Sequence, residues 1–195
     1  MSNMPPMLGY SIKGSLGSNS VPFIKVTKGP AVTQIASSNP RDDSYWIVFL
    51  DRNNPIAKVQ EFNVPAANNT AIPTGLDAFM SNPSYLFALV TQTMQCAHVP
   101  QGAFYDYLVS HGAGRELQKL EQLNTSFGCG QFANLSYALT GQCGPANNGS
   151  PAYEQGSGLN SVLLLLSLMP APNGQPPFSL CDSYTFYAGQ QAMGA

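Results

Sequence analysis

Six consecutive apolar residues, 45–50, constrain the fold more than any other part of this chain. A strand with one exposed face alternates apolar and polar side chains, so an unbroken apolar run predicts a strand buried on both faces. The turn cluster 51–55 follows, and residues 56–64 then return with more polar side chains. We therefore predict an antiparallel hairpin whose first strand is covered on both faces.

The other expected elements are short, and most of them are strands. Two strands are expected within residues 10–26, others at 85–93, 132–139 and 161–168, and an edge strand at 179–187. Helices are expected at 103–110, at 115–123 and after a capping box at 74–77, the last ending near Pro83. Because turns join the opening strands, this order predicts an α+β sandwich rather than alternating βαβ units.

The composition indicates a polar surface that is almost uncharged. Charged residues make up only 9% of the 195 residues and the net charge is −2, whereas soluble domains usually carry about 25%. Residues 122–195 contain two charged side chains, Glu154 and Asp182, and no cation that could bind phosphate. We expect one domain that associates easily with other proteins and has no nucleic-acid partner.

No apolar run approaches the roughly 20 residues that cross a bilayer, so we expect no membrane span. No leader peptide is recognisable at the start of the sequence, which suits a protein made in the cytosol or a mature form.

The cysteines leave two alternatives open. Four are present, Cys96, Cys129, Cys143 and Cys181, and they allow three pairings between which the sequence does not choose. Buried free thiols are the main expectation, and at least one disulfide is the alternative. No pair has the spacing of zinc ligands, so we expect no metal and no other cofactor.

The residues that catalysis needs are scarce. His98 is expected in a loop and His111 at a helix end, where its side chain faces the carbonyl groups. Asp42 and Asp43 are expected to cap a turn before the 45–50 strand. The sequence contains no Gly-x-Ser-x-Gly elbow and no phosphate-binding loop, and its carboxylates are too few and scattered to name a glycosidase pair. We therefore predict a protein without enzymatic activity.

Residues 135–154 resemble the closing segment of a known family, and other segments match it in order. The matches are a strand at 23–26, a hairpin at 45–50 and 56–62, a helix carrying Leu76 and Phe79, a strand at 85–93, a helix with a small-residue break at 104–114, and Ser-Tyr-Ala-Leu with a glycine turn at 136–144 followed by Glu154. Together they resemble the interleukin-like EMT inducer (ILEI/GG) domain family over residues 9–169. Two positions depart from the pattern: Asn63 follows Phe62 where the family has Asp, and 91–93 lack the usual acid.

The resemblance implies a sandwich of two antiparallel sheets with short flanking helices and no shared enzymatic activity. Members occur as secreted signalling proteins, as the glycan-binding stem of an O-mannose glycosyltransferase, and as modules of bacterial and phage surface or tail proteins. The low charge and the Asn, Gly, Ser and Gln content suit the phage or microbial type.

The candidate ligand-binding residues are Glu154, Tyr153, Asn147 and Asn148. Sugar sites pair flat aromatic rings with amides and carboxylates, and Tyr105, Tyr107, Tyr184 and Tyr187 are further candidates for the aromatic role. Trp46 is not, because it lies in the apolar strand. For Glu154 the main alternative is that its carboxylate binds backbone amides and fixes the closing loop.

Two functions of different classes follow from these features. The first is a structural or adhesion module of a larger assembly, most plausibly a phage virion component of the tail or baseplate, assembled in the host cytoplasm and bound to other structural proteins or copies of itself. In this function an N-terminal arm at 1–8 and a C-terminal extension at 170–195 contact neighbouring proteins of the assembly. The second is a monomeric extracellular domain that binds a cell-surface glycan or carries a signal.

Overall fold

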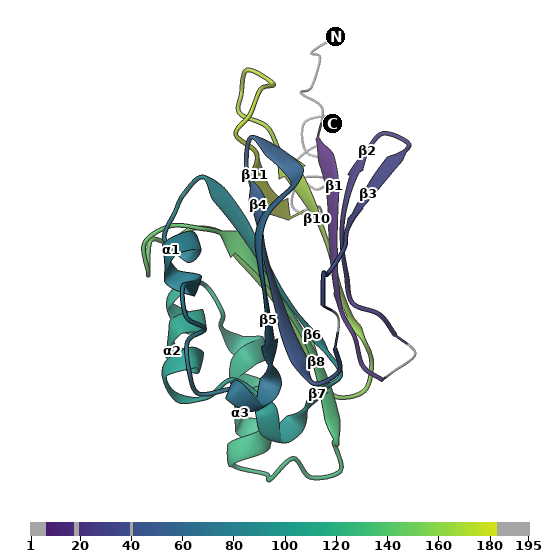
Figure 1. Cartoon of the computed structure of the whole chain (residues 1–195), viewed down its shortest axis with the longest axis vertical. Helices are drawn as coiled ribbons and strands as arrows, with labels where there is room; N and C mark the ends of the chain where they lie inside the picture. Colours follow the sequence, from purple (N-terminus) through teal and green to yellow (C-terminus); the bar gives the residue numbers. More distant parts are fainter. Residues whose placement is uncertain (1–6, 18–19, 40, 183–195) are drawn as a thin grey trace, which may run out of the picture.

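Two antiparallel sheets packed face to face make up most of the protein, and three short helices cover the outer face of one of them (Figure 1). The computed structural model describes residues 7–17, 20–39 and 41–182. This arrangement confirms the predicted α+β sandwich of two antiparallel sheets with short flanking helices. No helix in the described ranges is long and apolar enough to cross a membrane.

The five-stranded sheet has the strand order β11-β10-β1-β2-β3. Its strands are β1 (Leu8–Gly14), β2 (Phe23–Lys28), β3 (Ala31–Ile35), β10 (Val162–Met169) and β11 (Ser179–Asp182). The central strand β1 is therefore paired with one strand from each end of the chain. The stretch predicted as a C-terminal extension supplies the edge strand β11, whereas residues 183–187 lie outside the described residues.

The six-stranded sheet has the order β5-β4-β6-β8, and both β7 and β9 pair with β8. Its strands are β4 (Ser44–Asp51), β5 (Asn54–Pro65), β6 (Tyr85–Gln92), β7 (Met94–Gln95), β8 (Asn134–Gln142) and β9 (Ala152–Ser157). The helical layer consists of α1 (Leu76–Met80), α2 (Gly102–Ser110) and α3 (Arg115–Thr125), with 3-10 turns η1 (Ala66–Asn68) and η2 (Cys96–His98).

The six-stranded sheet is covered on both faces, which gives the protein two cores. Along β4, Tyr45, Ile47 and Phe49 pack among the helices, whereas Trp46 and Val48 face the five-stranded sheet. All five side chains are at most 3% exposed. The prediction that the apolar run is a doubly buried strand is confirmed, as is its pairing with β5.

Arg52, in the turn between β4 and β5, fastens the C-terminal strand to the sandwich. Its guanidinium donates hydrogen bonds to the carbonyl oxygens of Phe178 and Pro83, both at 2.8 Å, and to Ser179 Oγ at 3.0 Å. The N–H of Phe178 donates to the carbonyl of Arg52 in return. Burial lowers the pKa of Arg52. One turn residue thus holds the start of β11 in place.

Three local expectations need correction. The capping box at 74–77 does not form, because Gly75 takes the N-cap position with φ of 83° and no side chain caps the helix. Glu154 was expected in a closing loop and lies instead on the strand β9. Asp43, expected to cap its own turn, hydrogen-bonds residues more than 50 positions away, as described below.

Candidate functional site

The four candidate ligand-binding residues lie in two separate places. Asn147 and Asn148 line a polar pocket at the end of α2, with a volume of about 280 Å³. Tyr153 and Glu154 lie on β9, where Glu154 is opposite Leu139 of β8. Tyr184 and Tyr187 lie outside the described residues. The structure therefore does not bring the four into one constellation.

Glu154 joins β9 to the first turn of α3. Its Oε1 accepts hydrogen bonds from the backbone N–H groups of Gly114 at 3.0 Å and Glu116 at 2.7 Å, and its Oε2 accepts from that of Leu117 at 3.2 Å. These N–H groups are left without partners at a helix start, and no side chain of α3 itself caps them. The carboxylate also lies at the positive end of the helix dipole. Glu154 is thus a helix cap supplied by a strand 40 residues away.

Tyr137 completes the bonding of that carboxylate from the sheet side. Its hydroxyl donates to Glu154 Oε2 at 2.7 Å, and the side chain is fully buried. Burial, followed by the charge of Glu154, raises the pKa of the Tyr137 hydroxyl well above its ordinary value. The backbone of Tyr137 is fixed as well, because its N–H donates to Thr91 Oγ1 at 2.8 Å. With four donors around it, the carboxylate of Glu154 serves the fold.

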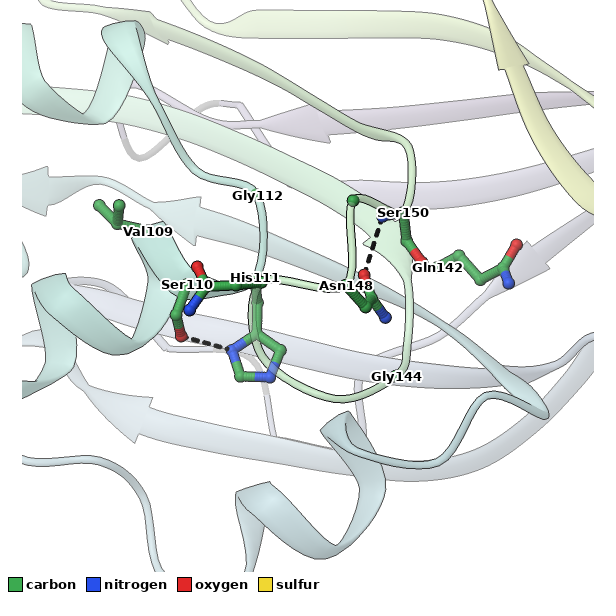
Figure 2. A pocket seen from close by; sticks show the side chains of 10 residues that line it. Val109, Ser110, His111, Gly112, Gln142, Gly144, Asn148 and Ser150 are labelled. Atoms are coloured by element: carbon green, nitrogen blue, oxygen red, sulfur yellow. Dashed lines mark hydrogen bonds between the residues drawn. The ribbon is translucent and has the colours of Figure 1, made fainter.

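His111 forms one wall of the polar pocket (Figure 2). Its Nδ1 lies 2.9 Å from the carbonyl oxygen of Tyr107, which can only accept, so Nδ1 carries a proton. Neutral imidazole then has an acceptor at Nε2. That atom is buried and has no hydrogen-bond partner among the described residues. The ring also contacts the ring of Tyr107, with centroids 4.4 Å apart.

The loop 144–150 forms the other wall. Asn147 has φ of 58°, and its N–H donates to the carbonyl of Ser110 at 2.7 Å, which ties the loop to the end of α2. Asn148 Oδ1 accepts from the N–H of Ser150 at 2.8 Å. Gly144 leaves room for the Asn148 amide, since a Cβ there would lie 2.1 Å from Nδ2. In Figure 2, His111 and Asn148 lie centrally, with Val109 and Gln142 at opposite sides.

The pocket offers hydrogen bonds without fixed charge. Its described lining contains the amides of Gln142, Asn147 and Asn148, the hydroxyls of Ser110 and Ser150, and the imidazole of His111, but no carboxylate, thiol, lysine or arginine. Such groups can bind a neutral hydroxyl- or amide-bearing molecule. His111 and Gln142 were not predicted for this role, because their neighbourhood with 147–148 arises only from the fold.

Asp43 and His98 form a second polar cluster, at the start of β4. Asp43 Oδ2 lies 2.6 Å from His98 Nδ1, and Oδ1 accepts from the N–H of Gln95 at 2.9 Å. The hydroxyl of Tyr45 donates to the carbonyl of His98, and burial with the nearby Asp43 raises its pKa. The cluster holds the β7–η2 segment against β4. His98, expected to be a plain loop residue, is therefore bound to a carboxylate.

A disulfide joins the same segment to the loop after α3. Cys96 and Cys129 are bonded, with their Cα atoms 5.8 Å apart. The expectation of free thiols is wrong for this pair and correct for Cys143, which is free and buried. Within the described ranges, no group of three or more His, Cys, Asp or Glu side chains is placed to hold a metal ion.

The outer face of the five-stranded sheet differs from the helix-covered face, because it exposes large apolar side chains. Leu163 of β10 is 44% exposed, Leu165 is 64% exposed, and Val32 of β3 is 59% exposed. The alternating residues of the same strands, such as Leu168 of β10 and Ile35 of β3, are buried against the other sheet. No helix of the described chain lies over this face (Figure 1).

Comparison with known protein families, with curated proteins and with solved structures found no match for this chain.

Proposed function

We propose that this chain is a non-enzymatic structural or adhesion module of a larger assembly, which is bound through the outer face of its five-stranded sheet. One observation carries the proposal. The sequence of β10, Val-Leu-Leu-Leu-Leu-Ser-Leu-Met, is that of a strand covered on both faces, like β4. Its inward residues Val162, Leu166 and Leu168 are buried, yet Leu163 on the outward side is 44% exposed. Exposed apolar surface on a sheet is typical of a protein interface.

Residues near both ends of the chain form strands of the same five-stranded sheet. Leu8, the last residue of the predicted N-terminal arm, begins β1, and Ser179 of the predicted C-terminal extension begins β11, so the described parts of both join this sheet. The finer proposal, a phage tail or baseplate component that is assembled in the host cytoplasm, rests on the family resemblance and on the low charge. The Cys96–Cys129 disulfide fits a protein that works outside a reducing cytoplasm, as an assembled virion or an extracellular domain does.

The experiment is sedimentation of the protein from its native source, with mass spectrometry of what sediments with it. We expect a defined particle that contains structural proteins, and loss of incorporation for Leu163→Asp. The matched control is Leu159→Asp, because Leu159 is 72% exposed and lies outside the sheet. A protein found alone at about 21 kDa, or two variants that assemble equally well, would contradict the proposal.

A second function, an extracellular domain that binds a neutral glycan, is favoured by the polar pocket. The amides of Asn148 and Gln142 and the hydroxyls of Ser110 and Ser150 bind the hydroxyl groups of a neutral sugar. Titration with a panel of neutral oligosaccharides tests it, with saturable binding that Asn148→Ala removes. Asn173→Ala is the control, because Asn173 makes the same local turn bond, to the N–H of Gln175, away from the pocket. Equal binding by both variants would exclude this pocket.

A further inference from the structure

The two outer surfaces of the sandwich carry opposite charge. The three helices α1, α2 and α3 contain four acids and two bases, whose balance is −2: Asp77, Asp106, Glu116, Glu121, Arg115 and Lys119. On the outer face of the five-stranded sheet the register places two lysines, Lys13 and Lys25, whereas Lys28 and Asp182 of the same strands have the register of the inward-facing Val26 and Leu166. In a chain with only 9% charged residues, this separation gives the two surfaces complementary potentials.

The acids of the helical layer act together on its tyrosines. Burial, followed by the charges of Glu121 and Asp106, raises the pKa of Tyr105. Burial and the nearby Asp77 raise the pKa of Tyr107 in the same way. Asp106 is exposed, while Lys119 is already paired with Glu116. Asp106 of α2 and Glu121 of α3 therefore both lie close enough to Tyr105 to act on it, and the helical layer as a whole has a negative balance.

On the sheet side, the lysines lie among apolar side chains. In the strand register Lys13 is opposite Leu163 on one side and Phe23 on the other. The ammonium group of Lys25 lies 4.2 Å from the centre of the Phe23 ring. When such a surface binds one that supplies carboxylates, the apolar groups are removed from water and the ammonium groups pair with the carboxylates.

We propose that the outer face of the five-stranded sheet binds the helical layer of a second copy of this chain, so that copies associate head to tail. The inference rests on the proposed function and names its partner. Five strands spaced about 4.8 Å apart and about 20 Å long present roughly 500 Å² in plan, and more as accessible surface. That area approaches the roughly 800 Å² per partner of a stable complex. The contact joins two different surfaces, so it generates a ring or a filament.

Charge reversal on each surface, followed by mixing, tests this arrangement. One variant carries Lys13→Glu with Lys25→Glu, and the other carries Asp106→Lys with Glu121→Lys. Each is expected to lose self-association at least about tenfold in sedimentation velocity at low salt, because both of its surfaces then carry the same sign. An equimolar mixture is expected to associate again, since each surface meets its opposite. High salt is expected to weaken the wild-type contact.

Circular dichroism verifies that both variants are folded, and Lys13→Gln with Lys25→Gln gives a milder change that is expected to weaken association without reversing charge. A mixture that stays monomeric would overturn the head-to-tail arrangement. If Leu163→Asp still removes the chain from a particle built of other proteins while mixing fails, the partner is a different protein. The proposed function would then stand and this inference would fall.

Discussion

The outer faces of the two sheets are both built from antiparallel strands, but among the described residues only the face of the six-stranded sheet is covered by helices. On the six-stranded sheet, Tyr45, Ile47 and Phe49 point outward and are fully buried beneath the helices. On the five-stranded sheet, the outward residues of β1 and β10 include Lys13, Ser11 and the exposed Leu163 and Leu165. The helices therefore complete one face within the chain. Among the described residues the other face exposes large apolar side chains, and the proposed interface rests on this difference.

Replacing a phenylalanine on each face gives the largest difference. Phe49→Ala is expected to lower the free energy of unfolding by about 3–5 kcal/mol, because it empties a fully buried site. Phe23→Ala is expected to cost below about 1 kcal/mol in the isolated chain, since its ring lies on the sheet surface. Urea denaturation of both variants measures this. Equal losses would mean that the two faces are covered alike.

Removing the disulfide is the next test of the helix-covered side. The bond links residues 33 positions apart, so Cys96→Ser with Cys129→Ser is expected to cost about 2–4 kcal/mol. Chemical denaturation with and without reductant gives the same quantity for the native chain. Cys143→Ser controls for the loss of a thiol, because Cys143 is not bonded. An unchanged midpoint under reductant would contradict a structural role for the bond.

The Glu154 cap on α3 is a third stabilising feature of the helix-covered side. Glu154→Gln is expected to destabilise the protein by about 1.5–3 kcal/mol, because it removes the charge that accepts three backbone bonds and that of Tyr137. Glu121→Gln serves as control, on the same helix and without this cap. If Glu154→Gln retained full stability and lost a ligand instead, the carboxylate would belong to a binding site.

Alkaline pH is expected to change the free energy of unfolding least and most gradually. The pKa values of Tyr45 and Tyr137 are raised in the folded state, so the unfolded chain loses its phenolic protons first. This contribution to stability is complete below pH of about 10 and is lost as the pH rises above it. Unfolding measured from pH 8 to 11 is expected to show a shallower decline for Tyr45→Phe. An identical decline would contradict the assignment.

The sequence allowed the hairpin with its doubly buried first strand and the main helices to be predicted, because continuous and periodic apolar patterns can be recognised in neighbouring residues. The strand β9 could not be predicted from the sequence. Its residues Tyr153 to Gly156 have no continuous apolar pattern, and they form a strand by pairing with β8. Contacts of long separation, such as Asp43 with His98, Cys96 with Cys129 and Glu154 with α3, depend on the fold. The pocket around His111 arises in the same way.

The most direct test of the account is lysine acetylation of the chain in its assembled and isolated states, read by mass spectrometry. Lys13 and Lys25 are expected to react much more slowly in the assembly, while Lys58 on β5, paired with Glu61, is expected to react at the same rate in both states. Equal reactivity of Lys13 and Lys25 in both states would contradict the claim that the open sheet face is the interface.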